Sequence, residues 1–161
     1  MTKEQFKTLF DLYFEDIRRY LYYRCGDTMV STDLAQDTFM RVWEKQMTLL
    51  PGKDKALLYK IAGDLFVSYT RRERLRREAP ERIHFERSDH SPEDQLQYRE
   101  MQDKYEEVLM KIPENQRIAF LMSRTEELSY QEIATRLSIS VKAVEKRISG
   151  ALSRLRKELT S

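Results

Sequence analysis

Hydrophobic residues near the start of the chain recur at intervals of three and four positions, which is the spacing of one face of an α-helix. The pattern stops at Gly26 and Asp27, a pair that favours the end of a helix. We therefore predict a long amphipathic first helix. Its buried stripe is made by Phe6, Leu9, Phe10, Tyr13, Ile17, Tyr20 and Leu21.

A second helix is predicted over residues 33–45, with Ser31 or Thr32 near its start as a capping residue. The same periodicity assigns its inward positions to Leu34, Ala35, Thr38, Phe39 and Val42, with Trp43 as a further candidate for the core. Its outward positions are then Asp33, Gln36, Asp37, Met40, Arg41 and Glu44.

A third helix is predicted from about Asp54 to Arg77, after a loop marked by Pro51 and Gly52. It ends in the run RRERLRRE, which has five arginines in eight residues. Two explanations fit such a run: a solvated helix end, where cations suit the helix dipole, and contact with nucleic-acid phosphates. The predicted core stripe of this helix consists of Leu58, Ile61, Ala62, Leu65 and Tyr69.

The periodicity fades in the segment APERIHFERSDHSP, which has two prolines and no regular apolar spacing. We predict an interdomain linker over residues 80–91, between a first domain over 1–79 and a second over 92–161. In the second domain a helix is predicted to begin with Pro113 as its first-turn residue. The helix before it is indicated by Leu96, Met101, Tyr105, Val108 and Leu109.

The stretch from Leu128 to Leu159 carries two helical stripes, which are separated by the short piece SIS. Ser129 and Glu132 form a capping-box pattern before the first stripe, and Ser140 is the expected N-cap of the second. Two short helices joined by about three residues are typical of a helix-turn-helix. The stripes are Tyr130, Ile133, Ala134 and Leu137, then Val144, Ile148, Leu152, Leu155 and Leu159.

The outer side of the second of these helices is polar and basic. A recognition helix enters the DNA major groove and reads base edges with side chains near its N-terminus, for which lysine, glutamate and serine have suitable groups. A solvated face would explain a basic helix on its own, but the helix-turn-helix spacing before it favours DNA binding. The candidate DNA contacts are Ser140, Lys142, Ala143, Glu145, Lys146, Arg147 and Ser149.

Composition narrows the fold class. The chain has 161 residues with only four Gly and four Pro, so we predict an all-α protein: two small helical domains joined by a linker, the second carrying the helix-turn-helix. The formal net charge is +2, so any nucleic-acid contact depends on local clusters of cations. Cys25 is the only cysteine, which excludes an internal disulfide and suits a reducing cytoplasm.

No motif argues for catalysis or for a cofactor. The sequence has no Gly-rich phosphate loop and no nucleophile elbow, and His84 and His90 lack the surrounding ligands of a metal site. No apolar run is long enough to cross a membrane, and no signal-peptide pattern is present. We therefore expect a cytoplasmic protein that is not an enzyme, binds no cofactor and is not itself membrane-embedded.

Three segments, in this order, resemble the extracytoplasmic-function (ECF) group of bacterial RNA polymerase sigma factors. DLAQDTFMRVW, residues 33–43, resembles the segment with which that family grips the polymerase clamp helices. LLYKIAGDLFVSYTRRER, residues 57–74, resembles its segment for the promoter minus-ten element. The segment from PENQRIAF to RLRKEL, residues 113–159, resembles its minus-35 domain.

The resemblance implies a factor that binds core RNA polymerase and promoter DNA and directs transcription initiation, with an anti-sigma factor as a further partner. The polymerase contacts would be Asp33, Gln36, Asp37 and Met40. The minus-ten contacts would be Lys53, Lys55, Lys60, Asp64, Arg71, Arg72 and Arg74. Tyr59 is a candidate for stacking on melted bases, whereas core packing is expected for Phe66. The recognition-helix residues would then read the minus-35 element.

The chain departs from the family pattern at several positions. Asp64 stands where the family often has Asn, and Glu127 and Ser138 stand where it often has Gly. If Ser138 has a positive φ, it carries a modest strain that glycine avoids. None of these changes interrupts a hydrophobic stripe. They affect the local backbone and the groups available to DNA.

Two other functions are compatible with parts of the pattern. One is a helix-turn-helix repressor or activator that binds DNA as a dimer without polymerase, and the other is a helical interaction module with no DNA role. The outward face with Gln36 and Asp37, together with the arginine-ended third helix, counts against a plain regulator, which needs neither. Binding to core polymerase separates these functions.

Overall fold

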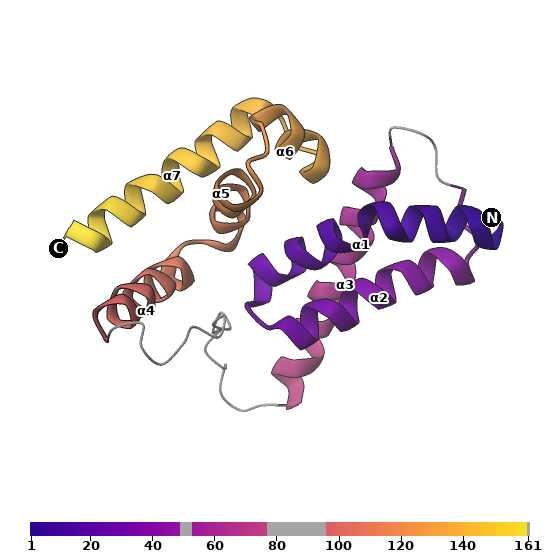
Figure 1. The fold of residues 1–161 in the computed structure, drawn as a ribbon, viewed down its shortest axis with the longest axis horizontal. Helices are drawn as coiled ribbons and strands as arrows, with labels where there is room; N and C mark the ends of the chain where they lie inside the picture. Colours follow the sequence, from indigo (N-terminus) through magenta and orange to yellow (C-terminus); the bar gives the residue numbers. More distant parts are fainter. Residues whose placement is uncertain (49–52, 77–95, 161) are drawn as a thin grey trace.

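The computed structural model describes residues 1–48, 53–76 and 96–160, and within these ranges the chain forms helices and turns without a strand. A first body consists of α1 (Lys3–Cys25), α2 (Thr28–Glu44) and α3 (Asp54–Arg76). A second body consists of α4 (Leu96–Lys111), α5 (Glu114–Glu126), α6 (Tyr130–Leu137) and α7 (Val141–Thr160), as Figure 1 shows. The predicted all-α fold is confirmed, whereas the predicted linker, 80–91, lies outside the described residues.

Capping residues define both ends of α1. At its start, the backbone N–H of Gln5 donates to the Thr2 hydroxyl at 3.1 Å, and the Gln5 side chain accepts from the Thr2 N–H at 2.9 Å. At its end, Gly26 adopts the left-handed conformation with φ of 69°, and its N–H donates to the carbonyl of Tyr22 at 2.7 Å. Glycine has no Cβ to strain this conformation. The helix therefore ends where the sequence predicts.

The second helix begins earlier than predicted. Asp27 is its N-cap, because its carboxylate accepts from the backbone N–H of Val30 at 3.1 Å. Ser31 is buried inside the first turns, and its hydroxyl donates to the carbonyl of Thr28 at 3.0 Å. The predicted start near Ser31 or Thr32 is thus wrong, and Val30, four residues before Leu34, continues the apolar stripe and packs against the core.

Aromatic rings from α1 and α2 build much of the core of the first body. The Phe10 ring stacks on Phe14 with centroids 4.5 Å apart and meets Phe39 edge-on at 5.2 Å. Such pairs contribute roughly 0.5–1.5 kcal/mol beyond the burial of their area. Trp43 is half-buried with its ring centroid 5.2 Å from that of Phe6, so it packs at the edge of this core as expected.

In the second body, α5 packs against α6 and α7, and α4 packs against α7. Pro113 is the N-cap of α5 and not its first helical residue, so the predicted helix start is one residue too early. The helix-turn-helix is present, with α6 and α7 separated by Ser138, Ile139 and Ser140. The core of this body includes Val108, Leu109, Ile118, Ala119, Met122, Ile133, Val144, Ile148, Ala151 and Leu155.

The predicted stripe of the helix-turn-helix is only partly buried. Tyr130, Leu152 and Leu159 are 38%, 37% and 43% exposed, so their assignment to the core is wrong. Ala151, directly beside Leu152, is fully buried instead. Periodicity identifies the face that a helix turns inward, but it does not say how far the neighbouring helices extend along that face.

Candidate functional site

The residues predicted to contact polymerase lie together on one face of α2. Asp33, Gln36, Asp37 and Met40 are all exposed, and Met40 is exposed to 54% despite its apolar side chain. Their spacing of three and four residues places them on one helix face. The opposite face is anchored in the core by Leu34, Ala35, Thr38, Phe39 and Val42.

Most of the residues predicted to contact the minus-ten element lie along one side of α3. An α-helix turns by about 100° per residue, so one side of α3 carries positions 60, 64, 71 and 74. All four side chains are exposed. Arg72 is exposed but points about a third of a turn away from this line. Lys53 precedes the helix and is exposed. The cations at the end of α3 are therefore accessible to a polyanion.

Lys55 is the member of this set that already has partners inside the protein. Its ammonium lies 4.0 Å from the Asp16 carboxylate and 5.2 Å from the centre of the Tyr13 ring. The Tyr13 hydroxyl in turn donates to Asp54 at 3.0 Å. Lys55 is half-buried, so contact with DNA would compete with these interactions.

Both helices of the helix-turn-helix start at serine caps. The Glu132 N–H donates to the Ser129 hydroxyl at 3.1 Å, and the Glu132 carboxylate accepts from the Ser129 N–H at 3.2 Å. The Ser140 hydroxyl accepts from the Ala143 N–H at 3.0 Å. The turn between them requires Ser138 to adopt φ of 56°, which is the left-handed conformation. The predicted caps are confirmed. Ser138 has the positive φ at which we expected a modest strain.

The outer face of α7 presents most of the predicted minus-35 contacts. Lys142, Glu145, Lys146 and Ser149 are exposed, and Arg147 is half-buried beside them. Of the other two predicted contacts, Ser140 is exposed before the helix and Ala143 is half-buried. The face opposite is held by Val144, Ile148, Ala151 and Leu155, which are buried.

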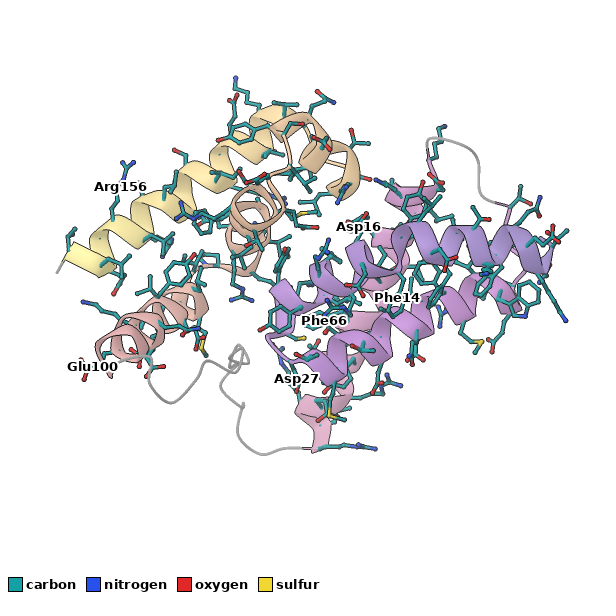
Figure 2. The ribbon with its side chains drawn as sticks, viewed as in Figure 1. Phe14, Asp16, Asp27, Phe66, Glu100 and Arg156 are labelled. Atoms are coloured by element: carbon teal, nitrogen blue, oxygen red, sulfur yellow. The ribbon has the colours of Figure 1, made fainter. Side chains whose placement is uncertain are left out.

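A charged cluster that the sequence did not reveal joins the two bodies. Asp16 and Arg19 come from α1, whereas Glu126 and Arg136 come from the second body, so that each side supplies one acid and one base. Arg136 lies 3.7 Å from Asp16 and 3.9 Å from Glu126, and Arg19 lies 3.5 Å from Glu126. Figure 2 shows Asp16 on the side of α1 that is turned toward the second body.

Arg117 forms a second link between the bodies. Its side chain is 2% exposed, and its guanidinium donates to the carbonyls of Tyr23 and Arg24 at 2.9 Å each. These carbonyls belong to the last turn of α1, where carbonyl groups have no N–H donor within their own helix. A cation at the C-terminus of a helix also suits the helix dipole. Beside this link, Arg24 pairs with Glu114 of α5.

Burial and neighbouring charges shift the pKa values of Glu126 and Arg136 in this cluster. Burial raises the pKa of the Glu126 carboxyl, against the lowering effects of the Tyr23 hydroxyl and of Arg136. Burial works to lower the pKa of Arg136, but Tyr59 and Asp16 outweigh it and raise that pKa overall. Arg136 is therefore a permanent cation placed between two acids. Its removal would leave Arg19, which lies 3.7 Å from Asp16 and 3.5 Å from Glu126, as the cation that those two acids share.

A cavity of about 470 Å³ opens at the same junction. Lys60 and Asp64 of α3 line one wall, and Arg136 and Ser138 line the other. Tyr59 is 4% exposed at this junction, and its hydroxyl accepts from Arg136 at 3.4 Å. The prediction that Tyr59 is available to stack on melted bases is therefore wrong for this arrangement.

Two other expectations for the first body are met. Phe66 is 5% exposed and packs in the core, with the Arg24 guanidinium 4.4 Å from its ring centre. Cys25 is half-buried, and burial raises the pKa of its thiol to about 11, so the thiol stays protonated at neutral pH. It is a packing residue and not a nucleophile.

Within the described residues, no three side chains of His, Cys, Asp or Glu are grouped so that they could hold a metal ion. Among the same residues, no helix combines the length and apolar character that crossing a membrane requires.

Family models match both bodies. The model described as sigma-70 region 2 matches residues 9–76, and the model described as sigma-70 region 4 matches residues 102–155. The first match spans α2 and α3 with most of α1, and the second spans the helix-turn-helix. The order of the two regions along the chain is the order that the sequence segments predicted.

Individual relatives point to the same family. The ECF sigma factor SigM of Bacillus subtilis is 26% identical over 135 residues, which cover 82% of this chain and 81% of SigM. The ECF sigma factor SigE of Mycolicibacterium smegmatis is 31% identical over 145 residues, which cover 87% of this chain and 56% of SigE. The ferric citrate uptake sigma factor FecI of Escherichia coli is 27% identical over 149 residues, covering 91% of this chain and 86% of FecI.

A solved structure has the same fold. It is that of the sigma factor RpoE in complex with the anti-sigma factor NepR from Bartonella quintana, which matches with a TM-score of 0.71 and 22% sequence identity over 98% of each chain. The alternative function, a DNA-binding regulator that acts without polymerase, does not explain why a region-2 match precedes the helix-turn-helix. The chain belongs to the ECF group of RNA polymerase sigma factors: a non-enzymatic initiation factor that binds core polymerase and directs it to promoters.

Proposed function

We propose that this sigma factor uses three separate surfaces to bind core polymerase, the minus-ten element and the minus-35 element. The face of α2 with Asp33, Gln36, Asp37 and Met40 contacts core polymerase. The cationic side of α3 contacts the melted minus-ten element, through Lys60, Asp64, Arg71, Arg72 and Arg74, with Lys53 and Lys55 near its start. The outer face of α7 reads the minus-35 duplex. The supporting observation is that each of the three helices turns most of these residues to solvent and buries its opposite face.

The chemistry of each surface suits its proposed role. Arginines at the end of α3 supply several donors to phosphates. On α7, Lys146 and Glu145 have groups that pair with base edges, whereas Arg147 lies at the flank, where phosphates run. The proposed domain limits are 1–79 and 92–161, joined by a linker over 80–91 that lets the domains take separate positions on a promoter.

We also propose that the protein works in the cytoplasm, where polymerase and promoter are found, and that an anti-sigma factor regulates it. The support for a regulator is the likeness in fold to RpoE, whose structure was solved with the anti-sigma factor NepR. Neither assignment requires a cofactor.

Site-directed photo-crosslinking tests which of the three surfaces contacts polymerase, minus-ten DNA and minus-35 DNA. A Cys25→Ser chain would carry one new cysteine, as Gln36→Cys, Lys60→Cys or Lys146→Cys, modified with a short photoreactive group. In a complex with core polymerase and promoter, we expect Gln36→Cys to crosslink to polymerase, Lys60→Cys to minus-ten DNA and Lys146→Cys to minus-35 DNA. Crosslinks from Lys60→Cys to the minus-35 element, or from Gln36→Cys to DNA alone, would overturn the assignment.

A further inference from the structure

An apolar side chain lies in the middle of the cationic side of α3. Val67 is 38% exposed, and its neighbours along that side are Lys60 and Asp64 before it and Arg71 and Arg74 after it. At about 100° per residue, Val67 points within the arc that these charged residues span. A single exposed apolar residue is ordinary on a protein surface. The position of this one, inside a line of proposed DNA contacts, gives it a possible chemical partner.

The charges on this side divide α3 into two parts. Arg71 and Arg74 suit phosphates, because a guanidinium supplies several donors to an anion. Asp64 does not suit phosphates, because a carboxylate is repelled by them, but it can accept from the amine of cytosine or adenine. Val67 makes no hydrogen bond with its side chain, and the apolar group that a base presents in the major groove is the thymine methyl. Asp64 and Val67 are helix neighbours three residues apart, so together they mark a part of α3 that suits base edges.

The surface beside Val67 has room for a methyl group. Gly63 has no side chain, and with Lys60 and Val67 it lines the cavity of about 470 Å³. A Cβ added at Gly63 would lie 3.3 Å from the Arg24 Nη1 and 3.3 Å from the Tyr20 hydroxyl, which is closer than ordinary van der Waals contact. Positions 63 and 67 are four residues apart and therefore adjacent on the helix surface. The glycine keeps the cavity open next to the valine.

We propose that Val67 is a specificity-determining residue, whose side chain contacts the 5-methyl group of a thymine in the minus-ten element while Asp64 accepts from the amine of a neighbouring adenine or cytosine. The proposal rests on the assignment of the minus-ten element to α3. The contact separates thymine from cytosine, which lacks the methyl group and presents an amine in the place of the thymine O4. Arg71 and Arg74 hold the backbone, and such contacts carry no sequence information directly.

Replacement of single thymines by deoxyuridine tests the contact, because it removes the 5-methyl group and leaves base pairing intact. The template is the strongest promoter that core polymerase with this chain selects from a promoter library. Each thymine of its minus-ten element, on either strand, is replaced in turn. At limiting enzyme, we expect one of these replacements to lower the run-off transcript about four-fold, the factor that corresponds to the burial of one methyl-sized group.

Val67→Ala removes the same contact from the side of the protein. Val67 is exposed and alanine is the better helix former, so the variant should keep the fold. With this variant, the thymine and deoxyuridine templates should give equal transcript, each about four-fold below that of the unmodified chain on the thymine template. Val67→Ile keeps a β-branched apolar side chain and should keep the preference for thymine over deoxyuridine.

The matched control is Leu75→Ala. Leu75 is an apolar residue of the same helix that is 88% exposed, and it lies outside the part assigned to bases, so its variant should keep the deoxyuridine effect. A deoxyuridine effect of the same size in Val67→Ala, or none in the unmodified chain, would overturn the role of Val67. In that case the Lys60→Cys crosslink to minus-ten DNA would persist. If that crosslink is lost as well, the assignment of the minus-ten element to α3 fails together with the proposal.

Discussion

Arg136 of α6 lies 3.7 Å from Asp16 of α1, and this ion pair joins the first domain to the second. Their side chains are only 10% and 20% exposed, so the pair is partly removed from water. An ion pair in such a place is screened less by salt than a surface pair. It also leaves an uncompensated charge behind when one partner is removed.

The first prediction is that Asp16 and Arg136 are energetically coupled. Arg136→Met and Asp16→Asn should each lower the free energy of unfolding, and the double variant should lose less than the sum, with a coupling on the order of 1 kcal/mol. Urea unfolding followed by circular dichroism measures it. The exposed pair of Glu15 and Arg18 provides the comparison, with a coupling of about 0.5 kcal/mol or less. Additive effects at Asp16 and Arg136 would mean that their contact has no energetic role.

A second prediction concerns the exposed face of α2. Replacing Gln36 and Asp37 by alanine should weaken competition for core polymerase while changing the free energy of unfolding by about 0.5 kcal/mol or less at each position, because both side chains are exposed. The measurement is displacement of a labelled sigma factor from core enzyme. An exposed pair elsewhere, Ser153→Ala with Arg154→Ala, is the control. If the α2 variant competes as well as the unmodified chain, these residues are not in the interface.

The third prediction separates base reading from phosphate contact on α7. Lys146→Ala should relax preference at one or two minus-35 base pairs, with a loss of roughly 1–3 kcal/mol of discrimination if the lost contact is bidentate. Arg147→Ala should weaken all promoters alike and reduce the salt slope by about one unit. Both variants would be transcribed on a promoter library at two salt concentrations.

The reverse outcome has a definite meaning. If Lys146→Ala lowers every promoter equally and Arg147→Ala shifts base preference, the face of α7 assigned to the bases is displaced by about one residue. If neither variant has an effect, α7 does not read the minus-35 element. Minus-ten preference should stay unchanged in both variants, because a different domain reads it.

The fourth prediction uses the backbone of the turn. Ser138 has φ of 56°, a conformation that costs a non-glycine residue roughly 1 kcal/mol relative to glycine. Ser138→Gly should therefore stabilise the second domain by up to about 1 kcal/mol. The matched control, Ser153→Gly in the interior of α7, should destabilise it by roughly 0.5–1 kcal/mol. A melting temperature that falls for Ser138→Gly would show that the serine has a compensating contact.

Local patterns predicted much of this structure. The helices follow from the spacing of apolar residues, and Gly26, Ser129 and Ser140 mark ends that the structure confirms. The start of α2 was misplaced because Ser31 and Thr32 are residue types that often cap helices, whereas the cap in the structure is Asp27. Leu152 was assigned to the core because its spacing is right, yet no neighbouring helix covers it fully.

The contacts that Arg117 and Arg136 make between the two bodies were not predictable from local pattern. Arg117 and Arg136 are charged residues in amphipathic helices, where solvent exposure is the ordinary expectation. Their burial depends on partners far away along the chain, such as the Tyr23 carbonyl, 94 residues from Arg117, and the Tyr59 hydroxyl, 77 residues from Arg136. Such a contact leaves no periodic signal in a single sequence. The position of Arg136 immediately beside the buried stripe of α6 is the single local hint.

Run-off transcription with purified core RNA polymerase on a promoter library is the most direct test of the central claim. Core enzyme with this chain should transcribe a subset of promoters that share a minus-ten and a minus-35 sequence, and core enzyme without it should not transcribe them. A chain that binds DNA specifically by itself, but never associates with core enzyme and directs no transcript, would contradict the account.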